Sequence, residues 1–180
     1  MSIAEAKDKP LFTPGPLTTS RTVKQAMLRD LGSRDFGFVH VVKDIRQRLL
    51  KLGGVASPAY EAILMQGSGT FSVEAVISSA LPADGKLLAI ANGAYGQRMI
   101  QIAKAHKIET VALSYAEDCQ PGLADIDQAL AKDSAITHVA VVHSETTTGL
   151  INPIAEIGAL VKRKHNRRLI VDAMSSLFGE

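Results

Sequence analysis

From residue 62 onward, short apolar segments alternate with segments whose apolar residues recur at helical spacing. The apolar segments are continuous rather than alternately polar, which is typical of strands that are covered on both faces. The predicted strands are Ala62–Met65, Lys86–Ala91, Glu109–Leu113, Thr137–Val142 and Arg168–Ala173. The predicted helices between them are Thr70–Ala80, Ala94–His106, Ala124–Ala131 and Pro153–Lys164. This order predicts an α/β fold with a mainly parallel sheet and helices on both faces.

The first sixty residues follow a different pattern. Two prolines flank Gly15, so the segment 12–16 is neither a regular helix nor a central strand. It is either a plain loop or a fixed stretch of backbone that lines a site. Ser20 is expected to cap a helix from about Arg21 to Leu31. Apolar residues at helical spacing then predict a second helix that ends at Gly53.

Composition and charge exclude several classes of function. The chain has 180 residues, 46% hydrophobic and 21% charged, which fits an ordinary globular protein with a sizeable core. The net charge of +2 is too small to indicate nucleic acid or a membrane surface as a partner. The basic run 162–168 is either a basic patch or a helix C-terminus, where cations are stabilising, and we favour the helix end.

The cysteine content and the lack of long apolar segments indicate the cellular compartment. The single cysteine, Cys119, excludes an intramolecular disulfide and fits a reducing environment. The sequence contains neither the apolar core of a signal peptide nor an apolar run long enough to span a bilayer. We therefore expect a cytoplasmic protein.

The segment Gln66–Thr70 joins a predicted strand to a predicted helix and contains two glycines. It is not a nucleotide P-loop, because no Gly-Lys-Ser/Thr sequence follows, and Ser72 replaces the third glycine of a dinucleotide fingerprint. Backbone N–H groups and the hydroxyls of Ser68 and Thr70 at a helix N-terminus suit a single phosphate group. The alternative is a tight turn that Ser68 caps.

Two further motifs lie at the same predicted edge of the sheet. Tyr95 lies among small residues, where a planar ring could stack on it, or else it is a surface side chain at a capped turn. The segment His143–Gly149 brings hydroxyls and a carboxylate to the end of its strand, where they either bond a ligand's oxygen or cap the next helix. His138 and His143 face opposite sides of one strand, so we expect no metal site.

Asp172 follows Leu-Ile-Val on a strand that is predicted to be internal. Burying a carboxylate is costly unless a cationic partner is present. A protonated pyridine nitrogen is such a partner, and the carboxylate keeps it protonated. The alternative is a carboxylate that caps the following turn. A phosphate cradle and a strand-end carboxylate at one sheet edge together indicate pyridoxal 5′-phosphate (PLP), although no lysine has a clear place as the group that would carry its aldehyde.

Four segments of the chain form a recognisable series. They are Thr13–Ser20, Leu64–Thr70, Ser144–Ile154 and Val171–Ser176. The series resembles the 2-aminoethylphosphonate:pyruvate aminotransferases, which are fold-type I, class V PLP-dependent enzymes. The resemblance implies the large domain of a PLP-dependent transferase. The reaction it implies is amino transfer from 2-aminoethylphosphonate to pyruvate, giving phosphonoacetaldehyde and L-alanine. Alanine–glyoxylate or serine-type aminotransferases are the alternative among enzymes.

The resemblance also implies roles for individual residues. It assigns the PLP site to six of them: Ser68, Gly69, Thr70, Tyr95, Thr147 and Asp172. In that order, the first three bind the phosphate, the tyrosine stacks on the ring, the threonine lies near the phenolic oxygen and the aspartate holds the ring nitrogen. Gly15 would border the substrate.

The family pattern includes parts that this sequence does not show. The Schiff-base lysine and the small C-terminal domain are expected beyond Glu180, so we expect no catalytic residue in this chain and no turnover from it alone. Residues 176–180 depart from the family's Ser-Phe-Gly-Gly by one extra residue. We therefore expect a tail and lead-in segment over 1–19 and a truncated large domain over 20–180. The complete enzyme is expected to be a homodimer acting on small molecules, and a non-catalytic remnant or interaction module is the alternative.

Overall fold

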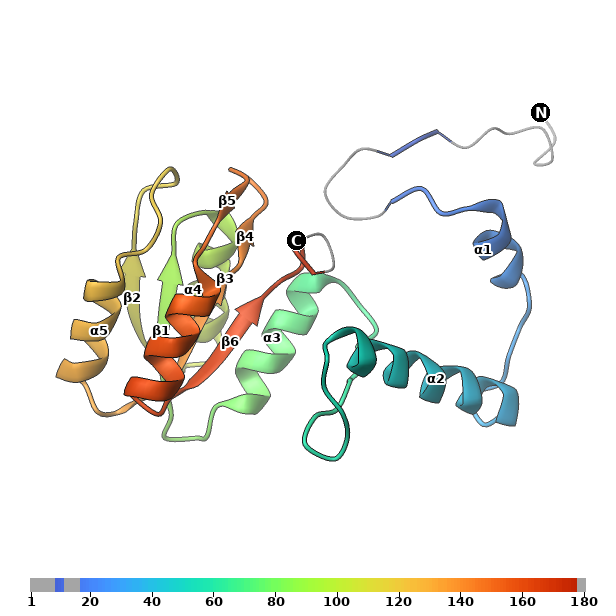
Figure 1. Ribbon diagram of the computed structural model, residues 1–180, viewed down its shortest axis with the longest axis horizontal. Coiled ribbons are helices and arrows are strands. Elements are labelled where there is room, and N and C mark those ends of the chain that lie inside the picture. Colours follow the sequence, from blue (N-terminus) through green and yellow to red (C-terminus); the bar gives the residue numbers. More distant parts are fainter. Residues whose placement is uncertain (1–8, 12–16, 178–180) are drawn as a thin grey trace. The chain divides into compact units, whose positions relative to one another are not determined.

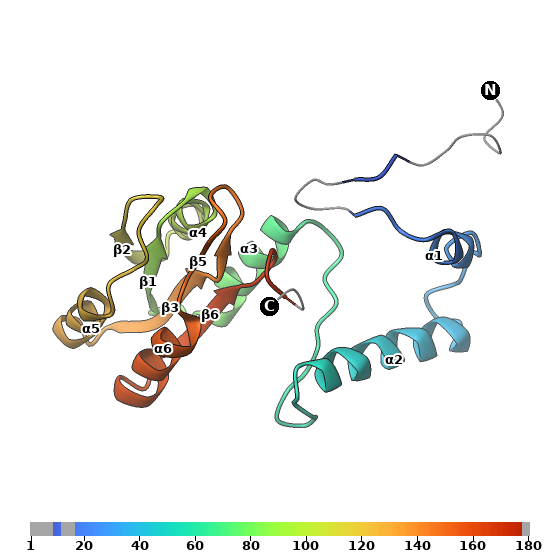
Figure 2. The same ribbon diagram turned by 45° about the horizontal axis from the view of Figure 1, so that its top comes forward.

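The computed structural model describes residues 9–11 and 17–177, and the chain divides into two units, Met1–Gln66 and Gly67–Glu180. Figure 1 and Figure 2 show the course of the chain from two directions. Each unit is described by itself. The predicted domain boundary near residue 20 stays a prediction, and Gly15 lies outside the described residues.

The first unit contains two helices, each with a side-chain cap at its start. Helix α1 (Arg21–Ala26) follows Ser20, whose hydroxyl accepts a hydrogen bond from the Val23 N–H. Helix α2 (Phe36–Leu52) follows Asp35, whose carboxylate accepts one from the Gly37 N–H. Both helices were predicted, and α2 ends before Gly53 as expected, whereas α1 is shorter than predicted. No residue of either helix is buried within the described residues.

The predicted strand Ala62–Met65 is wrong, because the structure gives this segment no regular secondary structure. A strand needs a hydrogen-bonded neighbour, and no part of the chain that the structure describes pairs with these residues. The Ala62 carbonyl instead accepts a hydrogen bond from Arg46 Nε at 2.8 Å, and Arg46 also pairs with the Glu61 carboxylate. A local apolar pattern does not reveal the hydrogen-bonded partner that a strand needs.

The second unit contains a four-stranded parallel sheet. Its strands are β1 (Lys86–Ala91), β2 (Glu109–Ser114), β3 (Ile136–Val142) and β6 (Arg168–Asp172). They lie in the order β2-β1-β3-β6, and every neighbouring pair runs parallel. The predicted parallel sheet is therefore confirmed for this unit.

Helices cover both faces of the sheet, as predicted (Figures 1 and 2). Helices α3 (Gly69–Ala80) and α4 (Ala94–Ala105) pack on one face. Helix α5 (Leu123–Lys132), helix α6 (Ile154–Gly158) and the π-helix η2 (Ala159–Lys164) pack on the other.

Strand β1 shows why the apolar runs are continuous. Leu87, Ala89 and Ala91 belong to the core on the α3–α4 side, whereas Leu88 and Ile90 belong to the core on the α5–α6 side. All five residues are buried. Because successive side chains of a strand point to opposite faces, a strand buried on both faces must be apolar at every position.

Two predicted elements are irregular in the structure. The predicted polar loop after β3 is a short hairpin, with β4 (Ser144–Glu145) antiparallel to β5 (Leu150–Ile151). The predicted helix over 153–164 is α-helical only in its first part and continues as η2. At its end, Lys164 and His165 both reach the Asp127 carboxylate of α5, at 2.6 Å each. This supports the structural interpretation of the basic run over a binding patch.

None of the helices in the described part of the chain is long and apolar enough to cross a membrane.

At Gly96, helix α4 lies close against β1. A Cβ added to Gly96 would lie 2.7 Å from Ala91 Cα and 2.9 Å from Ala91 Cβ, and neither atom can move without the strand. We expect Gly96→Ala to destabilise the fold by about 2–3 kcal/mol, as for other overpacked cores. Urea unfolding measures this loss.

Gly158→Ala is the matched control, because Gly158 has helical dihedral angles and its added Cβ would lie 3.6 Å from Leu169 Cδ2, an ordinary contact. Alanine is the better helix former by about 0.5–1 kcal/mol, so this variant should match or exceed the wild-type stability. Equal effects of the two substitutions would contradict the close approach at Gly96.

Two carboxyl groups should give the fold part of its acid sensitivity. Hydrogen bonds from Lys164 and His165 lower the pKa of Asp127, and bonds from Lys86 and the Ala135 N–H lower the pKa of Asp133. A folded-state pKa below the unfolded value means that the stabilisation is complete above about pH 4 and is lost as the pH falls through the lowered values. The double variant Asp127→Asn, Asp133→Asn should be less stable near neutral pH and should lose less stability on acidification.

Thermal unfolding between about pH 7 and 2 measures this difference. The exposed Asp84 forms no ion pair within the described residues, so Asp84→Asn is the control and should keep the wild-type profile. If the stability of the double variant fell with acidification as steeply as that of the wild type, Asp127 and Asp133 would not be the source of the acid sensitivity.

Candidate functional site

The predicted cofactor residues lie where the strands of the second unit end. The register pairs Val142 of β3 with Asp172 of β6, so the connections that leave both strands begin at one edge of the sheet. Helix α3 begins with the predicted phosphate residues, α4 carries Tyr95 in its first turn, and the β4–β5 hairpin carries Thr147. Open α/β sheets bind ligands at this edge.

The start of α3 is a capped turn with free backbone donors. Ser68 is the N-cap, and its hydroxyl accepts a hydrogen bond from the Phe71 N–H at 3.2 Å. Gly67 has φ +146°, a conformation that favours glycine, and a Cβ there would lie 2.8 Å from Phe71 Cδ1. The N–H groups of Gly69 and Thr70, which begin the helix, have no hydrogen-bond partner within the described residues. Ser68 therefore caps the helix, as the alternative interpretation predicted, and two backbone donors still remain free for an anion.

The loop after β6 touches this turn. A Cβ on Gly69 would clash with Met174 Cε, so Met174 packs directly on the first residue of α3. Met174 comes two residues after Asp172, and its N–H donates a hydrogen bond to Asp172 Oδ1 at 3.0 Å. The structure thus brings the strand-end carboxylate close to the predicted phosphate turn, although they come from positions a hundred residues apart.

Asp172 fills one of the two roles that the sequence left open and keeps an oxygen free for the other. It is half-buried, and its Oδ1 caps the turn that follows. Within the described residues its carboxylate accepts no other hydrogen bond, so Oδ2 keeps its capacity for a cationic partner. One carboxylate can therefore hold the turn and bind a protonated ring nitrogen.

Helix α4 is capped by a residue from another element. Gly93 precedes the helix and supplies no side-chain cap, and the carboxylate of Glu145 takes this place. Glu145 Oε1 accepts the Gly96 N–H at 2.7 Å, and Oε2 accepts the Tyr95 N–H at 3.2 Å. Glu145 is 0% exposed. The prediction that this carboxylate bonds a ligand is thus not supported, because helix α4 uses both of its oxygens.

A buried pair of amides joins the same two regions. Asn92 follows β1 and Asn152 follows β5, and both are 1% exposed. Each side-chain N–H₂ donates to the other's oxygen, at 2.8 and 3.0 Å. The remaining donors bond the Cys119 and Val142 carbonyls, both at 2.9 Å. Because every N–H is satisfied, the pair fixes the β1–α4 turn against the hairpin at little cost.

Thr147 is exposed in the hairpin turn. Among the described residues its side chain makes no hydrogen bond, whereas the neighbouring Thr146 hydroxyl bonds the Ser175 hydroxyl just beyond β6. The hairpin therefore lies beside the end of β6, and Thr147 stays a predicted ligand residue near that edge.

Arg98 is a residue that the sequence motifs did not include. It lies one turn after Tyr95 on α4, its guanidinium carbon is 5.4 Å from the centre of the Tyr95 ring, and Nη1 donates to Thr70 Oγ1 at 3.0 Å. The only available sequence signal was its spacing of three residues from Tyr95, which places both on one helix face.

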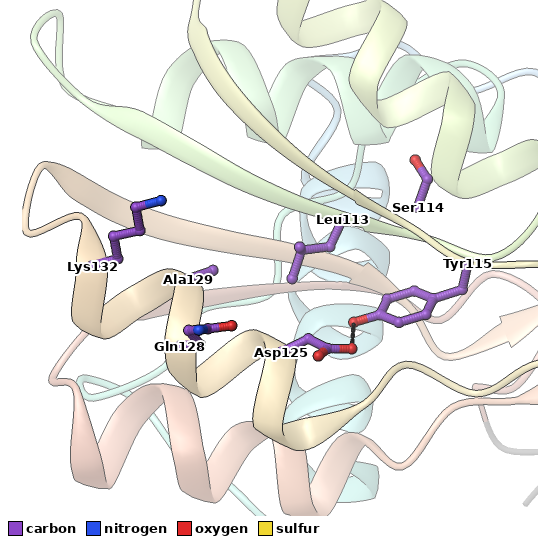
Figure 3. A pocket seen from close by; sticks show the side chains of 7 residues that line it. All are labelled: Leu113, Ser114, Tyr115, Asp125, Gln128, Ala129 and Lys132. Carbon is purple, nitrogen blue, oxygen red and sulfur yellow. Dashed lines mark hydrogen bonds between the residues drawn. The ribbon is translucent and has the colours of Figure 1, made fainter.

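Two hollows in the described part of the surface lie elsewhere. One of about 350 Å³ lies between β2 and α5, where the Tyr115 hydroxyl donates to Asp125 Oδ2 at 3.1 Å (Figure 3). Burial and the Asp125 carboxylate raise the pKa of Tyr115 to about 12, so its hydroxyl stays protonated at neutral pH. Another, of about 510 Å³, lies at the opposite sheet edge beside His138, whose pKa is lowered by burial and by Arg168. The six predicted cofactor residues line neither of them.

No group of three or more His, Cys, Asp or Glu residues in the described part of the chain is arranged to hold a metal ion. His138 bonds Thr137 through Nδ1, at 2.8 Å, and is a core residue of β3.

Comparison with known proteins gives consistent results. The family model described as aminotransferase class-V matches residues 19–180. The 2-aminoethylphosphonate–pyruvate transaminases of Lysinibacillus sphaericus and Klebsiella pneumoniae are each 52% identical to this chain over 94% of its length. The chain spans 46% of the length of each. The crystal structure of pyridoxamine–pyruvate aminotransferase from Mesorhizobium loti matches 97% of this chain and 44% of its own, with a TM-score of 0.84 and 26% identity.

The Glu145 cap leads to a prediction about stability. Glu145→Ala removes the acceptor of two N–H groups in a buried place, and each unsatisfied buried donor costs about 1–3 kcal/mol. We expect a loss of about 2–4 kcal/mol in urea unfolding, and a smaller loss for Glu145→Gln, which keeps one acceptor oxygen.

Glu156→Ala is the control, since Glu156 is an exposed acid in the first turn of α6. Its effect should stay within about 0.5 kcal/mol. Indistinguishable effects at Glu145 and Glu156 would show that the cap is energetically unimportant.

Proposed function

This chain belongs to the aminotransferase class-V family, and from that premise we propose that the complete protein transfers the amino group of 2-aminoethylphosphonate to pyruvate. The products are phosphonoacetaldehyde and L-alanine, and the cofactor is PLP. The two transaminases at 52% identity support this choice of substrates. Because the chain spans less than half of those relatives, the activity is proposed for the complete protein.

The residues present fit PLP. The observation that carries the proposal is the contact of Gly69 with Met174, which places the free N–H groups of α3 beside the loop that Asp172 caps. A phosphate monoester suits the helix N-terminus, and a pyridinium nitrogen suits the free oxygen of the carboxylate. PLP has these two groups at opposite ends of one ring.

The predicted site residues would contribute either by binding PLP or by keeping a proton on its ring nitrogen. When bound, PLP supplies a ring that withdraws electrons from the reacting carbon. Gly69 and Thr70 would hold its phosphate with N–H groups, and Ser68 keeps their turn in place. Asp172 would keep the proton on the ring nitrogen, since its negative charge raises the pKa of that nitrogen. Tyr95 would lie against the ring face.

Several parts of the proposal concern the complete protein. We place the Schiff-base lysine and a small C-terminal domain beyond Glu180, Gly15 at the substrate and Thr147 near the phenolic oxygen of PLP. We also propose a cytoplasmic homodimer. The N-terminal part alone would bind PLP weakly and without turnover.

An alternative amino donor is tested directly. We expect the complete protein to convert 2-aminoethylphosphonate with pyruvate at least tenfold faster than serine or alanine with glyoxylate, measured as L-alanine or glycine formed. The alanine–glyoxylate enzyme of Nostoc, with a TM-score of 0.80 and 26% identity, makes that comparison necessary. Robust turnover of serine without any turnover of 2-aminoethylphosphonate would assign the protein to the serine-type enzymes.

Asp172 allows a test of the cofactor's orientation. Asp172→Asn keeps an oxygen for the Met174 N–H but removes the negative charge, so the fold should persist while kcat falls about 10²–10³-fold. Asp172→Ala should lose as much activity and some stability as well. A fall of only a few-fold in the Asn variant would mean that Asp172 does not hold the ring nitrogen.

A further inference from the structure

Arg98 links the two parts of the proposed site that lie on different helices. From α4 it donates a hydrogen bond to Thr70 Oγ1 in the first turn of α3, at 3.0 Å. Its guanidinium also lies over the Tyr95 ring, 5.4 Å from its centre, within the range of a cation–π interaction. All three residues belong to the second unit.

This hydrogen bond determines what the Thr70 hydroxyl can do. A guanidinium has only donors, so Thr70 Oγ1 must be the acceptor. In a helix a threonine hydroxyl often donates to a backbone carbonyl of the preceding turn, but no such bond is made by Thr70 within the described residues. Its proton is therefore available to an acceptor in front of α3, beside the free N–H groups of Gly69 and Thr70.

The charge of a phosphate group also favours a binding role for Arg98. A phosphate monoester carries about −1.5 to −2 charges at pH 7, whereas a helix N-terminus offers only about +0.5. Arg98 is exposed and forms no ion pair with a carboxylate in the part of the chain that the structure describes. Its full positive charge therefore stands next to the turn.

We infer that Arg98 is a positioning residue for the phosphate of the cofactor. It fixes the Thr70 hydroxyl as a donor, supplies the positive charge that the helix lacks, and holds the Tyr95 ring one turn earlier on α4. This inference rests on the proposed function, because it takes the phosphate to be that of PLP.

Parallel titrations of the 180-residue chain with PLP and with pyridoxal, which lacks the phosphate, test the inference. Binding is followed by the absorbance of the ligand, and melting temperatures are recorded for each variant. We expect Arg98→Met to weaken PLP about 10–100-fold, as for a lost charged hydrogen bond, and to leave pyridoxal unchanged. Arg98→Lys should recover part of the loss, because it restores the charge without the planar fork. Arg163→Met, an exposed arginine of η2, should match the wild type.

Thr70 and pH provide two readouts that a merely structural arginine would not affect. If Arg98 acts through the hydroxyl, Thr70→Val and Arg98→Met together should weaken PLP by less than the product of their single effects, while Thr70→Ser, which keeps the hydroxyl, should recover most of the affinity that Thr70→Val loses. The wild-type affinity should fall as the pH drops through about 6, where the phosphate loses its second charge. That fall should be smaller in Arg98→Met.

The outcomes separate this inference from the proposed function. A wild-type chain that does not prefer PLP over pyridoxal would overturn the phosphate site, and with it the inference. A wild-type preference that Arg98→Met leaves intact would overturn the inference alone. An equal weakening of both ligands, with a lower melting temperature, would show that Arg98 only stabilises the fold.

Discussion

The geometry of the site depends on one buried carboxylate. Glu145 lies on β4, and its carboxylate reaches the first turn of α4, where it accepts hydrogen bonds from the N–H groups of Tyr95 and Gly96. A helix that begins at a buried sheet edge has donors that water cannot reach, and a carboxylate satisfies them better than a neutral group because the helix dipole is positive there. Fixing this turn fixes the direction of α4, and therefore the positions of Tyr95 and Arg98.

Two glycines permit this arrangement. Gly93 leaves room for the carboxylate, since a Cβ there would lie 2.6 Å from Glu145 Cδ. Gly96 lets α4 rest directly on Ala91 of β1. The amide pair of Asn92 and Asn152 then holds the hairpin to the same turn. The polar groups at this edge are thus mostly engaged with each other, which makes the edge rigid before any ligand is bound.

Among the described residues, several groups at this edge remain available to a ligand. They include the first N–H groups of α3, the hydroxyl proton of Thr70, the Arg98 guanidinium and one oxygen of Asp172. The first three attract an anion and the last attracts a cation, so the site distinguishes the two ends of its ligand. A rigid ring with a phosphate at one end and a protonated nitrogen at the other satisfies both, whereas inorganic phosphate would satisfy only one. This polarity supports PLP from geometry, and it agrees with the family assignment.

The sequence alone determined the four strands of the parallel sheet and the helices that cover it, although not the β4–β5 hairpin or the π-helical part of 153–164. Strands buried on both faces must be apolar throughout, and helices must keep an apolar side. The sequence also located the capped turn at the start of α3 and the carboxylate at the end of β6, because their residue types are tied to local backbone conformation and to the end of a strand. It was wrong about Ala62–Met65, because a strand needs a hydrogen-bonded neighbour that no local pattern reveals. It left open whether the carboxylate of Glu145 bonds a ligand or caps a helix, and it missed Arg98. Both roles arise from contacts between residues 28 to 50 positions apart, at Thr70, Tyr95 and Gly96, and only the tertiary structure brings such groups together.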